Sequence, residues 1–254
     1  MSALPPTSAT ALPVAQLGSG LKAWLIAGVL ILNLVVAAFA VHTLRQSQER
    51  TLEQVRSSTS NMAALIEDNI EDSGRRIDLA LLAIVDALEH QLANRPVDQV
   101  DVDSIIALYL KRVPEIDTLR ITDQYGAVRW GNGVDASKPA SYADRDFFAE
   151  HRAYPGLQMI VPEPLFGRLS KLWILPFTRS YRFPDGRFAG VIGAAVPVKY
   201  FFQHLSALEL GAHGSAVIRH VSRSLITRFP AVDGPGGKTG DKTVSAEFAA
   251  ALDS

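Results

Sequence analysis

The sequence predicts an α+β protein in which a long N-terminal helix precedes an antiparallel sheet unit and the start of a second such unit. Three observations lead to this fold class. An uncharged apolar run occupies Ala23–Val41. Apolar residues at helical 3-4 spacing follow it, and no proline interrupts them before Pro96. Beyond Pro96, short segments of alternating apolar and polar residues are separated by turns that contain Gly or Pro.

The apolar run has the length of a membrane span. Its 19 residues would rise about 28 Å as a helix, and Asn33 is its only strongly polar residue. We predict a transmembrane helix over residues 21–42, preceded by a disordered tail at residues 1–20 that is rich in Ala, Pro, Ser and Thr. A cleaved signal peptide is the alternative, because Ala38–Ala40 has the A-x-A form of a cleavage site. The run is longer than the usual apolar core of a signal peptide, however, and only one charged residue, Lys22, precedes it.

A long amphipathic helix is predicted over residues 43–95, as a stalk that continues from the membrane span. Two interpretations stay open for its first half: it packs on its own domain, or it forms the seam of a homodimer. The broader apolar face of Leu79–Leu92 favours packing on the domain, and Pro96 ends the helix. The spaced apolar residues are Leu52, Val55, Met62, Ile66, Ile77, Ile84 and Leu88, with Thr59 and Ser73 in two gaps.

The patterns beyond the stalk predict strands grouped around one short helix. Residues 118–131 alternate on both sides of Gln124-Tyr125-Gly126, as in a hairpin. Pro184-Asp185-Gly186 has the signature of a tight turn between two further strands. The predicted elements are a helix at 144–152, strands at 157–165, 172–182 and 188–198, a helix at 199–208, a hairpin at 214–229, a Gly-rich loop and a short closing helix.

These elements define one complete unit and part of another. Two strands, a helical crossover and three strands form a compact unit that we place at residues 96–198. Residues 199–254 repeat the start of this pattern as a linker helix and an incomplete second unit. Because that pattern stops after its second strand, we expect the chain to be the front part of a longer polypeptide.

Composition and motifs limit the chemistry. The chain has 254 residues and a formal net charge of −1, which gives no reason to expect a nucleic-acid partner. It has no cysteine, which excludes disulfides, thiolate nucleophiles and Cys-ligated metals. No His-x-x-x-His or His-Glu-x-x-His spacing indicates a metal, and the Gly-rich residues 234–240 lack the spacing of a phosphate-binding loop. We therefore predict no metal and no cofactor.

Charged and aromatic residues concentrate in Tyr142–Gly156, YADRDFFAEHRAYPG. Asp144, Asp146 and Glu150 lie within seven residues of one another, and paired carboxylates can carry out acid–base catalysis. The solvated face of a short helix is the more ordinary origin of such a cluster. We therefore predict no catalytic residue, and an anchored hydrolase that uses these three carboxylates remains the alternative.

Five pieces of the sequence, in order after the apolar run, carry a resemblance to one family. They are IEDNIEDSGRRIDLALLAIVDAL, ITDQYGAVRW, YADRDFFAEHR, LFGRLSKLWILPFTRSYRFPDGRFAGVIGAAVPVKYF and ELGAHGSAVIRHVSRSLITRFP. Together they resemble the double Cache (PAS-like, or PDC) sensor region of bacterial membrane-bound signal transducers, closest to those that precede diguanylate cyclase domains. The resemblance covers about residues 42–254.

The resemblance implies a function and a location. We expect a sensor of the bacterial inner membrane, with a single N-terminal span and the sensor domain in the periplasm. Basic residues lie on both sides of the span, so charge alone does not fix this orientation. The sensor would bind a small-molecule ligand, act as a homodimer and signal through the long helix to a cytoplasmic output that is not in this chain, which the resemblance implies to be a diguanylate cyclase. Accordingly the chain itself is not expected to be an enzyme. A chemoreceptor or histidine kinase sensor of the same fold, or a stalked adhesion or scaffold domain, is the alternative.

The resemblance also implies a ligand site beneath the short helix. The amino-acid-binding branch of the family has an Arg there, with Trp and Tyr two and three positions later. In this sequence the Arg is kept and the two aromatics are Phe, while the residues that hold the ligand's amino group are missing. An arginine is suited to a carboxylate, so we predict a small anionic ligand without an α-amino group. The matching positions are Arg145, Phe147 and Phe148, and those nearest the missing ligands are Leu165, Gly167 and Ala195.

Five further residues complete the predicted site, with Asp146 as the candidate partner of Arg179. Tyr142 either donates a hydrogen bond to the ligand or only fixes the loop to the sheet, and His151 either caps and bonds locally or contacts the ligand and senses pH. Trp173 and Arg179 share one strand face by period two. Trp173 is a candidate for core or ligand wall, and Arg179 is expected to pair with Asp146 or to bind the ligand. The predicted ligand-binding residues are Tyr142, Arg145, Asp146, Phe148, His151, Trp173 and Arg179.

Overall fold

A computed structural model describes residues 19–135, 137, 139–156, 158–168 and 170–244. The predicted tail up to residue 18 and the predicted closing helix from residue 245 lie outside the described residues. The chain divides after Asn61 into two compact units, Met1–Asn61 and Met62–Ser254.

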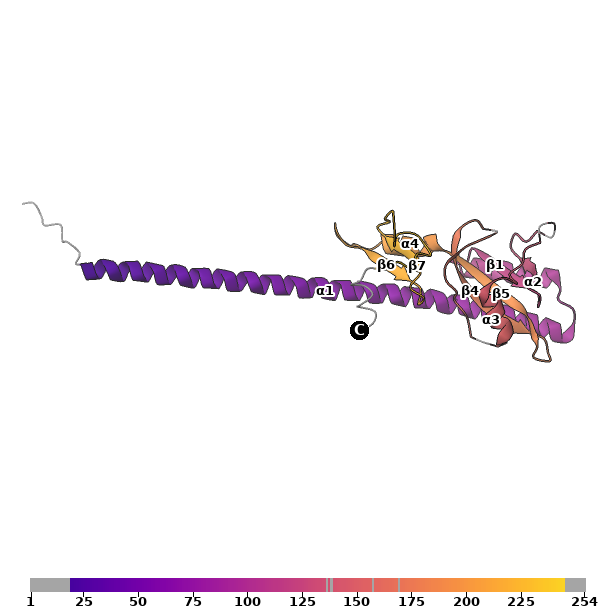
Figure 1. The fold of residues 1–254 in the computed structure, drawn as a ribbon. Helices are drawn as coiled ribbons and strands as arrows, with labels where there is room; N and C mark the ends of the chain where they lie inside the picture. The colour runs from indigo at the N-terminus through magenta and orange to yellow at the C-terminus, as the bar shows by residue number, and fades with distance from the viewer. Residues whose placement is uncertain (1–18, 136, 138, 157, 169, 245–254) are drawn as a thin grey trace, which may run out of the picture. The chain divides into compact units, whose positions relative to one another are not determined.

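Helix α1 (Ser19–Asn94) contains both the predicted span and the predicted stalk (Figure 1). Its segment Trp24–Ser47 has a mean hydropathy of 2.6 and, by length and composition, is the one helical segment among the described residues that is able to cross a membrane. The Asn33 amide donates to the Val29 carbonyl at 2.8 Å, so this polar side chain is satisfied within the helix.

The C-terminal part of α1 packs on its own unit. Ile77, Leu81, Ile84 and Leu88 are fully buried in the main hydrophobic core, whereas Val55 is 57% exposed. Packing on the domain is therefore confirmed for residues 77–88.

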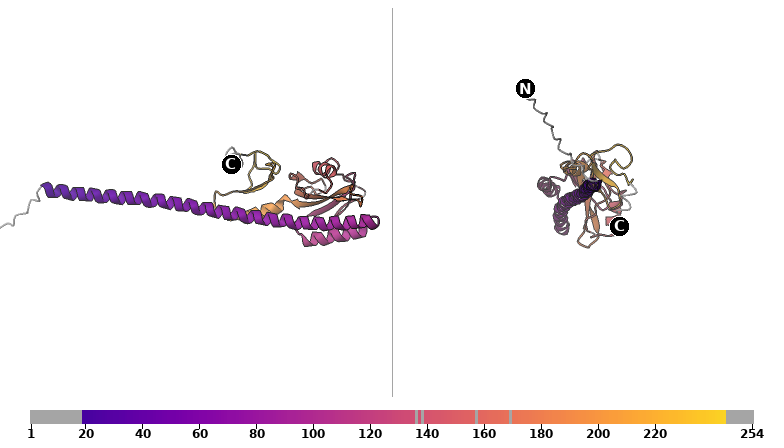
Figure 2. Two further views of the ribbon diagram at one scale, coloured as in Figure 1. Left: turned by 90° about the horizontal axis from the view of Figure 1, so that it is seen from below. Right: turned by 90° about the vertical axis from the view of Figure 1, so that its left-hand side faces the viewer.

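A second helix that the sequence reading missed, α2 (Gln99–Arg112), runs beside this part of α1 (Figure 2). Asp98 caps it by accepting from the backbone N–H groups of Val100 and Asp101 at 2.7 and 3.4 Å. Val102 and Ile106 are buried against the core. The chain therefore re-enters a helix directly after Pro96, instead of passing from the stalk to a strand.

One antiparallel sheet follows, and it confirms the α+β class. It contains β1 (Thr118–Thr122), β2 (Val128–Gly131), β3 (Leu165–Phe166), β4 (Trp173–Arg182) and β5 (Phe188–Pro197). The strand order is β2-β1-β5-β4-β3, and β4 and β5 pair along nearly their whole length.

The strand predicted at 157–165 is wrong for residues 158–164. Only Ile160 makes a bridge there, exchanging both backbone hydrogen bonds with Thr178 at 2.9 and 2.8 Å. Pro162 and Pro164 have no N–H to donate, so pairing cannot continue through them.

Helices cover both faces of the sheet. α1 and α2 lie on one face, and the short helix α3 (Asp146–Ala153) lies on the other, as the left view of Figure 2 shows. Phe147 and Phe148 fix α3 to the sheet in a second, smaller core with Val191.

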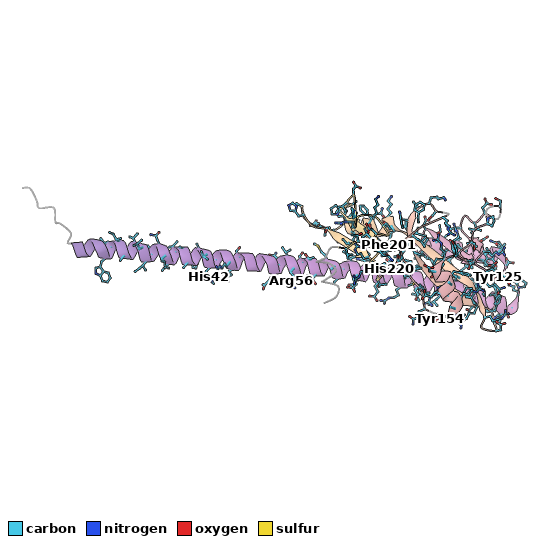
Figure 3. All side chains as sticks on the ribbon, in the orientation of Figure 1. His42, Arg56, Tyr125, Tyr154, Phe201 and His220 are labelled. Atoms are coloured by element: carbon cyan, nitrogen blue, oxygen red, sulfur yellow. The ribbon has the colours of Figure 1, made fainter. Side chains whose placement is uncertain are left out.

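The remaining elements are α4 (Val198–Ser206) and the hairpin of β6 (Ala216–Arg219) and β7 (Leu225–Phe229). The hairpin forms the predicted two-stranded start of a second sheet. His220, labelled in Figure 3, ties it to the segment before β3, because its Nε2 donates to the Val161 carbonyl at 2.9 Å.

Candidate functional site

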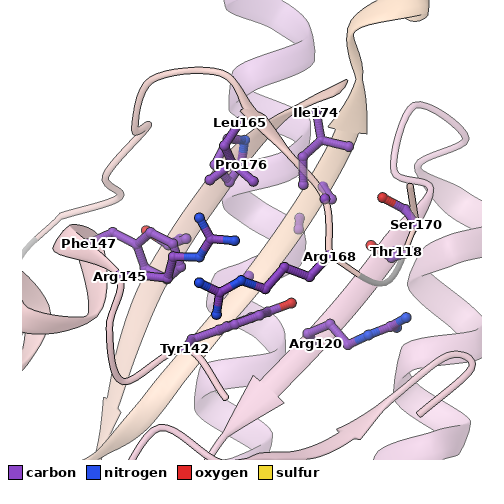
Figure 4. A pocket seen from close by; sticks show the side chains of 15 residues that line it. Thr118, Arg120, Tyr142, Arg145, Phe147, Leu165, Arg168, Ser170, Ile174 and Pro176 are labelled. Atoms are coloured by element: carbon purple, nitrogen blue, oxygen red, sulfur yellow. The ribbon is translucent and has the colours of Figure 1, made fainter. Parts of the chain in front are cut away.

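A cavity opens on the α3 face of the sheet, between α3 and the β3–β4 loop (Figure 4). It holds about 560 Å³ of empty space, part of which is open to solvent. Only a small molecule fits this conformation. The walls are Thr118 and Arg120 of β1; Tyr142, Arg145 and Phe147; Leu165, Gly167, Arg168 and Ser170; Ile174, Pro176 and Thr178 of β4; and Gly193, Ala194 and Ala195 of β5.

The loop before α3 is held against the β1–β2 turn. The Tyr142 N–H donates to the Gly126 carbonyl at 2.8 Å, and the Arg145 N–H donates to the Tyr142 carbonyl at 2.9 Å. Gly126 has a φ of +87°, and a Cβ there would lie 2.6 Å from the Ala143 nitrogen, so only glycine permits this approach. The aromatic pair of Tyr142 and Phe147 then fixes the Tyr142 ring edge to face, with centroids 5.9 Å apart.

Arg145 lies at the N-cap of α3 and lines the cavity, as predicted from the resemblance. Its guanidinium points into the cavity in Figure 4. Within the described chain, this guanidinium has neither a hydrogen-bond acceptor nor an ion-pair partner. A half-buried arginine without a partner is a ready site for an anion.

Arg168 enters the same cavity from the β3–β4 loop but is already neutralised. Its two terminal nitrogens donate to the two oxygens of Asp144 at 3.0 and 2.5 Å, a fork-to-fork pair. The pair holds the pKa of Asp144 below its usual value. A general acid needs a raised pKa, which Asp144 does not have. Asp146 and Glu150 are exposed on α3, so the three carboxylates have the character of a solvated surface.

Arg120 of β1 lines the cavity and, like Arg168, was not among the predicted site residues. Its side chain is 6% exposed, and its Nη1 donates to the Leu119 carbonyl and to Asn132 Oδ1 at 3.0 and 2.9 Å. Its buried Nε has no acceptor in the described protein. Burial lowers the pKa of Arg120, while the charges of nearby Tyr142 and Asp117 act in the other direction.

The β3–β4 loop brings a second unsatisfied group to the cavity. Ser170 Oγ is buried without a partner in the described residues. It occupies the space beside Gly167, where an added Cβ would lie only 2.2 Å from this oxygen. The tight loop closes through hydrogen bonds from the Gly167 N–H to the Leu172 carbonyl and from the Lys171 N–H to the Gly167 carbonyl, at 2.8 and 2.9 Å.

Tyr142 supplies a neutral donor. Burial raises the pKa of its hydroxyl, although the charges of Arg120, Arg145 and Arg168 act in the other direction. The phenol therefore stays protonated in the physiological pH range.

The structure places two predicted residues on the opposite side of the sheet or at its edge. Arg179 does share a face with Leu175 and Phe177, but that face meets α1, and Arg179 pairs with Asp78 at 2.5 and 2.9 Å instead of with Asp146. Trp173 is 41% exposed at the start of β4, where it stacks edge to face on Phe166. Alternation showed which residues share a face, but not which layer that face meets.

Three further predicted residues belong to α3 without lining the cavity. Asp146 is exposed, and Phe148 is buried against Phe188 with ring centroids 5.4 Å apart. His151 is fully buried, and its Nε2 lies 3.0 Å from the hydroxyl of Thr178, which does line the cavity.

The positions that would hold an amino group are apolar or small and do line the cavity. They are Leu165, Gly167 and Ala195. No Asp or Glu lines this cavity in the described part of the chain, and no cluster of metal-ligating residues occurs there either. The cavity is therefore basic, with no carboxylate to receive an ammonium group.

Solved structures with a similar fold include one extracellular domain and the ligand-binding domains of two chemoreceptors. The extracellular domain of a protein described as a histidine kinase, rpHK1S-Z16, matches with a TM-score of 0.65 and 23% identity, over 78% of this chain and 79% of that chain. This chain has the fold of a Cache-like extracellular sensor domain. The Campylobacter jejuni chemoreceptor Tlp3 ligand-binding domain, in complex with 4-methylisoleucine, matches with a TM-score of 0.53 and 12% identity, over 66% and 67% of the two chains.

A third sensor domain of this fold is that of the Pseudomonas aeruginosa amino acid chemoreceptor PctC in complex with GABA. It matches with a TM-score of 0.50 and 15% identity, over 64% of this chain and 70% of that chain. No protein-family model matches the sequence, and no curated protein matches it.

Proposed function

We propose that this chain is a membrane-anchored sensor whose extracytoplasmic unit binds a small anionic ligand, without an α-amino group, in the cavity beneath α3. The observation that carries the proposal is the guanidinium of Arg145, which among the described residues has no partner and lines a cavity to which those residues bring no carboxylate. The Cache-like fold supports a sensor role, and the apolar segment Trp24–Ser47 supports anchoring in the bacterial inner membrane.

The ligand would act on the helix that leads to the membrane. α1 packs on the far face of the sheet whose near face lines the cavity. A ligand that draws α3 and the sheet together changes the surface on which α1 rests, and it shifts the population of α1 positions by its differential affinity for them. We infer that the functional state is a homodimer and that the output lies on the cytoplasmic side.

The class of that output stays a prediction. The sequence resemblance favours a diguanylate cyclase, whereas the three similar structures described above come from a histidine kinase and two chemoreceptors. The fold serves a sensor of any of these classes, because the output is separate from the ligand-binding unit.

The test is ligand binding by the full chain in detergent, measured as a shift in melting temperature against a panel of small carboxylates, followed by calorimetry. We expect Arg145→Ala to weaken binding of the best carboxylate at least tenfold, which is the loss of one charge-assisted pair of about 1.4 kcal/mol or more. Arg152→Ala is the matched control, because Arg152 is an exposed arginine of the same helix that does not line the cavity. Unchanged affinity in Arg145→Ala, or binding of free amino acids in place of carboxylates, would contradict the proposal.

A further inference from the structure

The charges around the cavity specify the ligand more closely than a single anion site does. We propose that the site takes a short dicarboxylate, with Arg145 and Arg120 as two separate carboxylate partners. This inference rests on the proposed function, which requires an anion at Arg145 alone.

The count of charges favours two negative groups on the ligand. Three arginines line the cavity, and no Asp or Glu lines it in the described chain. Asp144 neutralises Arg168 from outside through both of its oxygens. The guanidinium groups of Arg120 and Arg145 therefore remain without an ion-pair partner in the described chain, although the charge of Asp117 is felt at Arg120.

Arg120 carries the strongest part of the argument. Its hydrogen-bond partners, the Leu119 carbonyl and Asn132 Oδ1, are neutral, so none of them balances its charge. Arg120 as a residue is only 6% exposed, and a largely buried charge favours a counter-ion, because an isolated buried charge is costly. A ligand carboxylate beside its unpartnered Nε would supply that charge and an acceptor together.

A second unsatisfied donor lies in the same wall. The buried hydroxyl of Ser170 has no partner among the described residues. Ser170, Arg120 and Thr118 line both this cavity and an adjoining recess, which Asp117 and Asp135 also line. Figure 4 shows Arg120, Thr118 and Ser170 on one side of the view and Arg145 on the other. The ligand thus meets one group of donors from β1 and the β3–β4 loop, and another from the start of α3.

Two separate carboxylates fit this arrangement better than one doubly charged group. Arg120 and Arg145 come from different elements, and Tyr142, whose pKa both charges influence, stands as a neutral donor between the two charges. A short carbon chain would cross the apolar floor formed by Ile174, Pro176 and Ala195, with one carboxylate at each arginine.

Calorimetry with the full chain in detergent tests the inference with matched probes. Succinate and glutarate are compared with butyrate and valerate, which have the same chain lengths but one carboxylate, and with inorganic phosphate. We expect one dicarboxylate to bind at least tenfold more tightly than its matched monocarboxylate and than phosphate. Equal affinities within a matched pair, or tighter binding of phosphate, would overturn the dicarboxylate while the proposed function stands; no binding by any of these anions would overturn both.

Variants then assign the two partners. We expect Arg120→Met and Arg145→Ala each to weaken binding of the dicarboxylate at least tenfold, whereas only one of them weakens binding of the monocarboxylate. Arg129→Ala is the control, since Arg129 is an exposed arginine of the neighbouring strand, paired with Asp123. An unchanged dicarboxylate affinity in folded Arg120→Met would refute its role. If Arg120→Met does not fold, the comparison of matched probes on the unaltered chain still decides the ligand class.

Discussion

Acidification is expected to destabilise the sensor unit through one residue, His151. The imidazole is fully buried under α3. The Thr178 hydroxyl donates its single hydrogen to the Ile160 carbonyl at 3.1 Å, so it accepts from His151 Nε2–H at 3.0 Å. His151 Nδ1 is then a buried nitrogen without a partner in the part of the chain that the structure describes, and protonating it would create an N–H with no acceptor there.

The magnitude follows from the pKa of His151. Burial lowers it from 6.5 to about 4; the nearby charge of Arg179 adds to this effect, and the contact with Thr178 opposes it. Because the folded pKa lies below the unfolded one, the unfolded chain binds the proton more tightly. Stability is therefore complete above pH 6.5 and falls as the pH is lowered towards 4, by about 2 kcal/mol at pH 5 and about 3 kcal/mol at pH 4.

The assay is urea unfolding between pH 7 and pH 4, followed by the fluorescence of Trp130 and Trp173 in the sheet, for the unaltered chain and for His151→Gln. Glutamine keeps a donor for Thr178 but does not titrate. We expect the stability difference between the two proteins to change by about 3 kcal/mol in favour of the variant on going from pH 7 to pH 4, since other titrating groups cancel in the comparison. The exposed His90→Gln serves as control. A difference that does not vary with pH would refute the assignment.

Three further outcomes follow from particular contacts. In a double-mutant cycle measured by urea unfolding, Arg179→Ala and Asp78→Ala should show a coupling energy of about 2 kcal/mol, because both side chains are largely buried. A coupling energy near zero would mean that the ion pair makes no net contribution to stability. Gly190→Ala should lower the free energy of unfolding by about 3 kcal/mol or more, because its Cβ would lie 2.1 Å from the Thr122 carbonyl oxygen. Gly186→Ala, with open space around it, should lower it by only about 1 kcal/mol, and equal decreases would contradict this reasoning. Sedimentation in detergent should show a dimer for the unaltered chain. The double variant Val55→Lys with Met62→Lys should be a monomer, whereas the control Val100→Lys on α2 should stay a dimer. A monomeric unaltered chain would refute the homodimer.

The predictable parts of the fold are those with strong periodicity. The long alternation of β4 and β5 and the 3-4 spacing of α1 gave elements close to those observed. α2 was missed although its signals were present, namely Asp98 as N-cap and buried Val102 and Ile106 one turn apart. Because proline ends a helix, Pro96 indicated a break at this point, and the helix that begins three residues later was not predicted.

The site was predicted only in part, for a physical reason. Arg145 and Tyr142 could be placed because both shortly precede the short helix, within one of the segments that carry the resemblance. Arg120 and Arg168 could not, since an arginine in a hairpin strand or in a loop is usually solvated, and only the sheet order brings them to the same cavity. Leu165, Gly167 and Ala195 line the cavity, so the positions suggested by the resemblance lie at the candidate site even where their chemistry differs.

β4 links the cavity to α1 by simple alternation. Its neighbouring residues point to opposite faces, so Thr178 lines the cavity and bonds His151, whereas Arg179 binds Asp78 of α1. At the end of the strand, the Arg182 N–H donates to Glu89 of α1 at 2.9 Å. Asp78 and Glu89 are about three turns apart on α1, so a displacement of β4 would act on the helix at two positions. A strand held in this way transmits a small shift without a hinge, because packed side chains move together and compress little. The residues that carry a signal to the membrane are therefore expected to be the polar pairs on the α1 face of β4, and not those that touch the ligand.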